Sequence, residues 1–234
     1  MRPTNQGHRQ RLTGSRSTAH AVLGELSAPS APRARYQTTH NVVDKLRILA
    51  GLIHTDRENP AVDAALGEAL GRRADGQWAV PEHDDLGELR SIYRYVRDHV
   101  RYTADPYDLE TFRRPQRTLE LGIGDCDDAT ALVGAMASAA GYQQGLRIVR
   151  TGDHADWNHI YNVVGVPRSE PQRWVPIDAT MDRGVGWEVT GPTVRASETY
   201  LADGPNVEQI AGVDRAPWLG WGALVAGIAL WAGR

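Results

Sequence analysis

The chain has 234 residues, of which 41% are hydrophobic, and its formal net charge is −3. This length and apolar content are typical of one globular domain with polar ends, and the slightly acidic balance gives no basis for nucleic-acid binding by the folded core. The single cysteine excludes an intrachain disulfide and a multi-cysteine metal site, and it fits a reducing compartment.

Residues 1–35 differ in composition from the rest of the chain. They contain six arginines and one acidic residue, Glu25, among many Ser, Thr, Pro and Gln residues. The segment has no long apolar run, so it is not a secretory signal peptide. We expect a disordered basic arm. The alternative is a tether for nucleic acid, an acidic partner or an assembly surface.

Apolar residues recur at helical spacing from about Thr39 onward. The pattern predicts a first helix through Ile53, a second helix around residues 60–71, and a third, amphipathic helix around residues 86–100. Residues 76–81 contain Gly and Pro and separate the second helix from the third.

Residues 126–140 form a further predicted helix, which is closed by Gly141 and carries many Ala and Gly side chains that permit close packing. Alternating segments predict strands near residues 145–151, 159–166 and 173–179, with further short strands between 185 and 200. This order of helices followed by strands predicts an α+β fold, in which the helix at residue 126 packs on an antiparallel sheet.

Residues 216–233 contain no charged side chain and follow a predicted linker at 204–215. An eighteen-residue helix spans about 27 Å, close to the roughly 30 Å of a bilayer's hydrocarbon layer. Trp218, Trp221 and Trp231 stand where interfacial anchors lie in membrane helices. We therefore expect an apolar helix that is a candidate membrane anchor. The alternative is a terminal helix that docks on the folded domain or on a partner chain.

Cys126 lies where a glycine-bearing loop meets the helix at residues 126–140. A helix N-terminus is electropositive and lowers the pKa of a thiol, so we expect rapid alkylation with a midpoint below about 8.5. Asp125 is a candidate N-cap, and Asp127 and Asp128 lie in the first turn. These carboxylates would raise the thiol pKa if they faced the sulfur. They match no calcium-binding loop, so no metal site is predicted.

A nucleophilic cysteine needs a histidine to take its proton and a third group to hold the imidazole. His159 opens one predicted strand, and Asp178 ends the next. The three residues Cys126, His159 and Asp178 are therefore candidates for a shared site. His154 is a rival base in the preceding loop, and the alternative for Asp178 is a turn residue that closes the strand.

Three stretches of the sequence resemble the transglutaminase-like superfamily, in its microbial or phage branch. They are residues 124–130 (GDCDDAT), the histidine that opens a strand at 159, and residues 174–180 (WVPIDAT). Residues 92–102 (IYRYVRDHVRY) are similar to the lead-in of such domains. The resemblance covers about residues 40–200. It implies a papain-like α+β fold, a catalytic domain over residues 36–203, and a Cys126, His159 and Asp178 triad.

The resemblance implies a cysteine-dependent acyl-transfer enzyme that acts on peptide or carboxamide bonds through a thioester, without a cofactor. We expect hydrolysis by a peptidase or amidase rather than crosslinking. The alternative is a non-catalytic assembly or scaffolding protein that keeps the fold. The Cys126 N–H is one expected oxyanion donor, and Gln116 and Thr118 are open candidates for a second.

The expected partners are a protein or peptide substrate, a membrane through residues 216–233, and an assembly partner through the basic arm. We expect a cytoplasmic or membrane-associated protein, or a virion-associated one if a phage encodes it.

Overall fold

The computed structural model describes residues 41–105, 111–204 and 206–210. Helices dominate the first part of this range and strands the second. The helices are α2 (Val42–Asp56), α3 (Pro60–Leu70), α4 (Asp85–His99), α5 (Pro115–Leu121) and α6 (Cys126–Ala139). The strands are β1 (Arg101–Tyr102), β2 (Ile123–Gly124), β3 (Gln144–Thr151), β4 (His159–Val166), β5 (Arg173–Ile177), β6 (Val194–Leu201) and β7 (Glu208–Gln209).

The first three described helices begin at polar side chains that accept hydrogen bonds from the first turn. Asn41 accepts from the N–H of Asp44 at 2.9 Å, and Asn59 does the same for Ala61 at 2.9 Å. Such caps satisfy N–H groups that have no partner inside the helix. The three helices predicted before the cysteine are confirmed at α2, α3 and α4.

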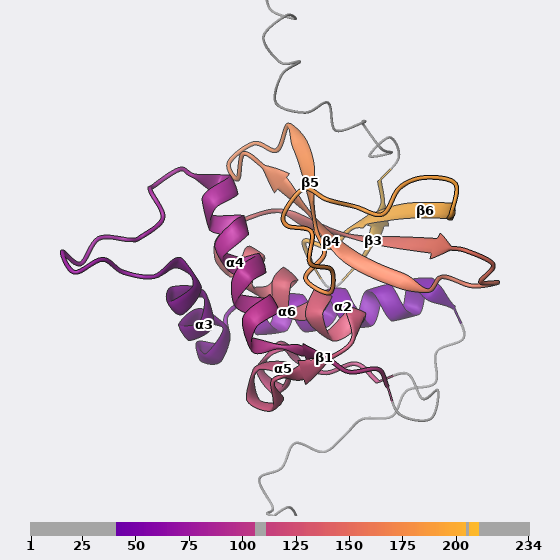
Figure 1. The fold of residues 1–234 in the computed structure, drawn as a ribbon, viewed down its shortest axis with the longest axis horizontal. Coiled ribbons are helices and arrows are strands. Elements are labelled where there is room, and N and C mark those ends of the chain that lie inside the picture. The colour runs from indigo at the N-terminus through magenta and orange to yellow at the C-terminus, as the bar shows by residue number, and fades with distance from the viewer. Residues whose placement is uncertain (1–40, 106–110, 205, 211–234) are drawn as a thin grey trace, which may run out of the picture. The chain divides into compact units, whose positions relative to one another are not determined.

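Five strands form one antiparallel sheet in the order β5-β4-β3-β6-β7. The strand predicted at 159–166 is β4, and those predicted near 145–151 and 173–179 correspond to β3 and β5. In place of short strands between 185 and 200 the chain forms one eight-residue strand, β6. Figure 1 shows β3, β4, β5 and β6 of this sheet gathered together, with α4 beside them and α2 below them. The mixed α+β fold with an antiparallel sheet is confirmed.

Helix α6 lies at the centre of the domain and contributes side chains to two apolar clusters. One cluster joins α6 to α3, α4, β4 and β5, and the other joins it to α2, β3 and β6. Gly134 shows how close this packing is, since an added Cβ there would lie 2.6 Å from Gln144 Oε1 and 2.7 Å from Ile53 Cδ1. The small side chains of α6 therefore let the sheet and α2 approach it.

Two local elements were absent from the sequence prediction. Helix α5 begins with Pro115 and ends at Gly122, whose φ of +62° is left-handed. Both are ordinary helix-boundary signals, but the helix has only seven residues and carries little periodicity. Strands β1 and β2 form a two-residue parallel pair that tertiary contact alone brings together.

The linker predicted at 204–215 is corrected in its first half. Strand β7 pairs with β6, with Gln209 opposite Tyr200 and Glu208 opposite Leu201, so residues up to Ile210 continue the sheet. Gly204 and Asn206, which lie between β6 and β7, are residue types that favour turns.

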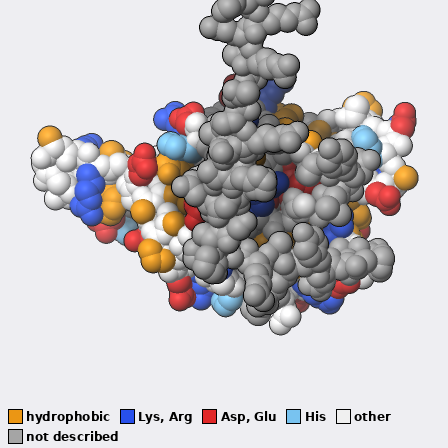
Figure 2. Space-filling model, turned by 90° about the horizontal axis from the view of Figure 1, so that it is seen from below, with side chains coloured by type: hydrophobic (Ala, Val, Ile, Leu, Met, Phe, Trp, Pro, Cys, Tyr) orange, Lys and Arg blue, Asp and Glu red, His pale blue; other side chains and the backbone are white. Residues whose placement is uncertain are grey.

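The predicted arm at 1–35 and the predicted apolar helix at 216–233 lie outside the described residues. Within the described ranges, no helix has both the length and the apolar character that a membrane crossing needs. Where described residues are visible in Figure 2, acidic and basic side chains are interspersed, as the small net charge leads one to expect.

Candidate active site

Cys126 is the first residue of α6, and the sequence around it explains why the helix begins there. Asp125 has an extended backbone and forms a capping box with Asp128, in which each carboxylate accepts from the other residue's N–H at 3.4 Å. Gly124 has no side chain at a point where an added Cβ would lie 2.7 Å from the Cβ of Asp128. The predicted capping role of Asp125 is confirmed.

Asp128 is fully buried and is held by Arg113 from the segment before α5. The Arg113 backbone N–H donates to Asp128 Oδ1 at 2.8 Å, and its guanidinium pairs with Asp128 Oδ2. This carboxylate therefore ties residues 111–114 to the first turn of α6. A buried carboxylate requires a cationic or hydrogen-bonding partner, and Arg113 supplies both to Asp128.

The thiol of Cys126 is partly buried at the edge of the core formed by α2, α6 and β3. Burial is the largest cause that raises the pKa of the Cys126 thiol to about 12, and the charges of Asp127 and Asp125 contribute to the same shift. The backbone N–H groups of Ile160 and of Cys126 act in the opposite direction. The predicted low pKa is therefore wrong for this arrangement, because desolvation and two carboxylates outweigh the helix N-terminus.

His159 is the first residue of β4, and its ring Nε2 lies 2.6 Å from Asp178 Oδ2. A carboxylate can only accept, so Nε2 carries a proton, and in the neutral ring Nδ1 keeps its lone pair. The Asp178 side chain follows β5 directly and is 3% exposed. The structure therefore brings His159 and Asp178 together in the way that an oriented general base requires.

Thr180 holds the second oxygen of Asp178 in place. Its backbone N–H lies 3.0 Å from Asp178 Oδ1, and its hydroxyl lies 2.6 Å from the same atom. Both carboxylate oxygens of Asp178 are therefore engaged, which fixes the plane in which the carboxylate meets the imidazole. Sequence reasoning missed this role, although an Asp followed two residues later by Thr is an ordinary turn signal.

The start of α6 packs on the start of β4, so the cysteine and histidine segments are neighbours. The Thr130 hydroxyl lies 2.6 Å from the carbonyl oxygen of Cys126 and 3.2 Å from that of Ile160. The Ile160 N–H also hydrogen-bonds to the Cys126 sulfur. The sulfur thus lies beside Ile160, the residue that follows His159 in β4, and Asp178 contacts Nε2 of the His159 ring.

The rival residues named from the sequence occupy other positions. His154 is exposed in the loop between β3 and β4. Gln116 accepts from Asn59 at 3.0 Å and donates to Glu120 at 2.9 Å. Thr118 is buried within α5, and its hydroxyl faces the carbonyl oxygen of Arg114.

Three carboxylates at the start of α6 are close enough to share a cation. One ligand atom from each of Asp125, Asp127 and Asp128 lies within 4.8 Å of the others. The proximity follows from the capping box and the first helical turn, and Asp128 already pairs with Arg113. We therefore assign these residues to the helix start, and we assign no metal to them.

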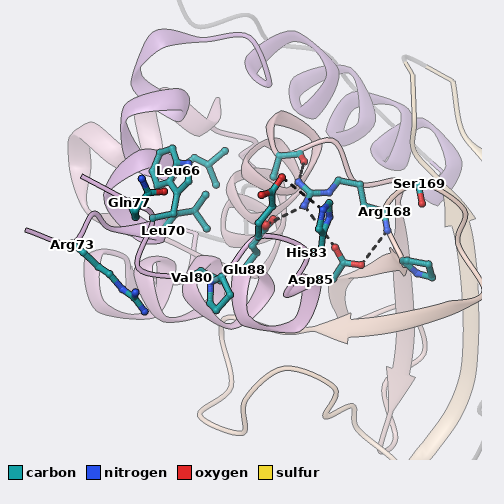
Figure 3. Close-up of a pocket in the computed structure, with 15 residues that line it drawn as sticks. Leu66, Leu70, Arg73, Gln77, Val80, His83, Asp85, Glu88, Arg168 and Ser169 are labelled. Carbon is teal, nitrogen blue, oxygen red and sulfur yellow. Dashed lines mark hydrogen bonds and ion pairs between the residues drawn. The ribbon is translucent and has the colours of Figure 1, made fainter. Parts of the chain in front are cut away.

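A pocket of about 1090 Å³ lies at the other end of α6, between α3, the loop before α4 and the turn after β4. Figure 3 shows Glu88, Asp85 and Arg168 pointing toward one another in its wall. The Arg168 guanidinium donates to Glu88 at 3.0 Å, and the backbone N–H of Arg168 donates to Asp85 at 3.3 Å. The pocket borders the C-terminal ends of α6 and β4, whereas Cys126 and His159 are the first residues of these elements. A helix of 14 residues is about 20 Å long, so the pocket and Cys126 lie at opposite ends of α6.

Residues 73–179 match the family model of the transglutaminase-like superfamily, and this range contains all three predicted site residues. None of the curated proteins matches the chain. Among solved structures, a "putative protease" from Parabacteroides distasonis ATCC 8503 is 12% identical with a TM-score of 0.42, and the match covers 70% of this chain and 30% of that one.

A Rad4-Rad23 structure crosslinked to undamaged DNA is 12% identical with a TM-score of 0.41, covering 73% of this chain and 48% of that one. A structure described as a TGase is 13% identical with a TM-score of 0.37, covering 75% and 41%. The chain thus spans less than half the length of these three structures. The similarity to the transglutaminase-like superfamily rests on the family model, which matches residues 73–179.

Proposed function

We propose that this protein is a cysteine-dependent acyl-transfer enzyme in which Cys126 is the nucleophile, His159 the general base and Asp178 the orienting carboxylate. The observation that carries the proposal is the 2.6 Å contact between His159 Nε2 and Asp178 Oδ2. It leaves Nδ1 as the basic atom of a ring that begins the strand on which the sulfur packs.

The proposed reaction proceeds through a thioester. The Cys126 sulfur attacks the carbonyl carbon of a peptide or carboxamide bond, and His159 Nδ1 takes the thiol proton. The carbonyl electron pair moves to the oxygen and forms an oxyanion. When this intermediate collapses, the C–N bond breaks and the leaving amine takes the proton from His159. Water or an amine then attacks the thioester, and the proton returns to the sulfur through the same ring.

The high thiol pKa bears on how the nucleophile is activated. With a pKa of about 12, the resting thiol is neutral near pH 7, so the proton leaves during attack rather than before it. This favours general-base catalysis by His159 over a preformed thiolate and imidazolium pair. The same observation favours the alternative, a non-catalytic assembly protein that keeps the fold, because an unreactive thiol is what such a protein would retain.

We propose hydrolysis by a peptidase or amidase in preference to crosslinking, as the family resemblance implies. Membrane association through residues 216–233 and assembly contacts through residues 1–35 are further proposals, and so is placement in the microbial or phage branch. Cytoplasmic, membrane-associated or virion-associated localisation depends on these two segments.

The proposal is tested with p-nitrophenyl acetate and the full chain. The wild-type protein should release p-nitrophenol faster than Cys126→Ala, and a mass spectrum should show one acetyl group on Cys126. A rate equal to that of Cys126→Ala would refute the enzyme proposal and support the scaffold alternative. Added n-butylamine distinguishes the two fates of the acyl-enzyme. If the enzyme is a hydrolase, the decay rate of the acyl-enzyme should not depend on the amine concentration. If it is a crosslinking enzyme, the decay rate should increase with the amine concentration.

A further inference from the structure

Tyr102 is an aromatic residue near the start of α6 that belongs to none of the apolar clusters formed by the described residues. It belongs to β1 and is 58% exposed. An exposed tyrosine contributes little apolar burial to stability, so its ring and hydroxyl are available to a ligand.

The β1–β2 pair fixes the backbone of Tyr102 beside the residues that precede Cys126. Tyr102 lies opposite Gly124 in parallel register, and the N–H of Thr103 donates to the carbonyl oxygen of Gly124 at 2.8 Å. The N–H of Arg101 donates to the carbonyl oxygen of Gly122 at 2.9 Å. These hydrogen bonds flank Tyr102 on both sides and hold it next to the segment that ends at the cysteine.

The direction of the Tyr102 side chain follows from its partner. Paired residues in neighbouring strands project to the same face of a sheet. The Cβ direction of Gly124 points at the first turn of α6, since an atom there would lie 2.7 Å from Asp128 Cβ. Tyr102 therefore projects to the face of the β1–β2 pair on which the first turn of α6 lies.

The charged groups that act on the Tyr102 phenol include residues at the start of α6. Partial burial raises the pKa of Tyr102, and the charges of Cys126, Asp125, Asp127 and Asp105 raise it further, in that order. A phenol with a raised pKa stays protonated at neutral pH and keeps a hydrogen to donate. Cys126 is the first charge in this series, which agrees with the position of Tyr102 opposite Gly124.

An oxyanion formed at Cys126 needs more than one donor. The Cys126 N–H at the helix start is one, but Asp125 and Asp127 lie close to the sulfur and oppose new negative charge. Gln116 and Thr118, the donors considered from the sequence, are engaged within and beside α5.

We propose that the Tyr102 hydroxyl is the second oxyanion donor of the Cys126 site. This inference rests on the proposed acyl-transfer function. The hydroxyl donates a hydrogen bond to the carbonyl oxygen as the sulfur attacks, keeps its proton throughout, and releases the oxygen when the C=O bond re-forms.

The test compares two reactions of the same sulfur in the full chain. Acylation by p-nitrophenyl acetate passes through an oxyanion, whereas alkylation by iodoacetamide displaces iodide and forms none. Tyr102→Phe should lower the acylation rate by about 100-fold, as the loss of one oxyanion donor does, while alkylation stays within about twofold of wild type. Tyr95→Phe is the matched control, since it removes a tyrosine hydroxyl from α4, where it faces Glu68 at 3.5 Å.

Each other outcome overturns the inference in a distinct way. Acylation by Tyr102→Phe within about threefold of wild type would show that the hydroxyl is not an oxyanion donor. An equal fall in acylation and alkylation would show that Tyr102 acts on the thiol instead. If the wild-type protein acylates no faster than Cys126→Ala, the proposed function itself fails, and this inference fails with it.

Discussion

The pH dependence of Cys126 alkylation is the sharpest test of the electrostatics at the start of α6. The structure raises the thiol pKa from the ordinary 9.0 to about 12, with burial as the largest cause. Each pKa unit corresponds to about a tenfold change in thiolate at a given pH below the pKa. Near pH 7, Cys126 should therefore hold about 1000-fold less thiolate than an ordinary thiol, and its alkylation should slow accordingly.

The measurement is the rate of iodoacetamide alkylation between pH 6 and pH 10. With the pKa raised, the rate should climb about tenfold per pH unit across this whole window and show no plateau. Steric burial lowers the rate equally at every pH, so the slope separates the electrostatic effect from restricted access. A plateau with a midpoint below about 8.5 would refute this account and restore the helix-terminus interpretation of the sequence.

The perturbation is Asp127→Asn, which removes a charge that raises the thiol pKa but keeps the shape of the side chain. Alkylation at pH 8 should become faster, by about tenfold for each pKa unit recovered. Asp63→Asn is the matched control, because Asp63 is an exposed first-turn carboxylate of a different helix, α3. If both variants alkylate like the wild type, the charge of Asp127 does not reach the sulfur.

The remaining predictions concern the other site residues and the C-terminal segment. His159→Ala should abolish acylation by p-nitrophenyl acetate while His154→Ala leaves it nearly intact, and the reverse result would move the base to the loop. Asp178→Asn should lower acylation by about 100-fold to 10,000-fold because the ring loses its fixed tautomer, and an unchanged rate would remove Asp178 from the mechanism. Thr180→Val should lower it by about tenfold, since one hydrogen bond to Asp178 Oδ1 is lost, and a rate equal to wild type would show that Thr180 is dispensable. Deletion of residues 216–234 should move the protein from the membrane fraction to the soluble fraction, and an unchanged distribution would favour the docked helix.

Much of the fold could be predicted because its signals are local. The apolar spacing of α2 and α4 and the alternation of β4 place side chains on one face of each element, whatever lies beyond it. The cap at Asp125 likewise depends only on residues within one turn. Helix α5 was missed because seven residues give too few repeats for a periodic pattern.

The sequence by itself determined that Cys126 begins a helix, that His159 begins a strand and that Asp178 follows the next one, because each position depends on near neighbours in the chain. Only the tertiary structure decided the direction of the thiol pKa shift and the contact between His159 and Asp178. It also decided that Tyr102 lies beside the cysteine segment. Burial and Coulomb interactions depend on distances through space, and residues far apart in sequence set those distances only after the chain has packed.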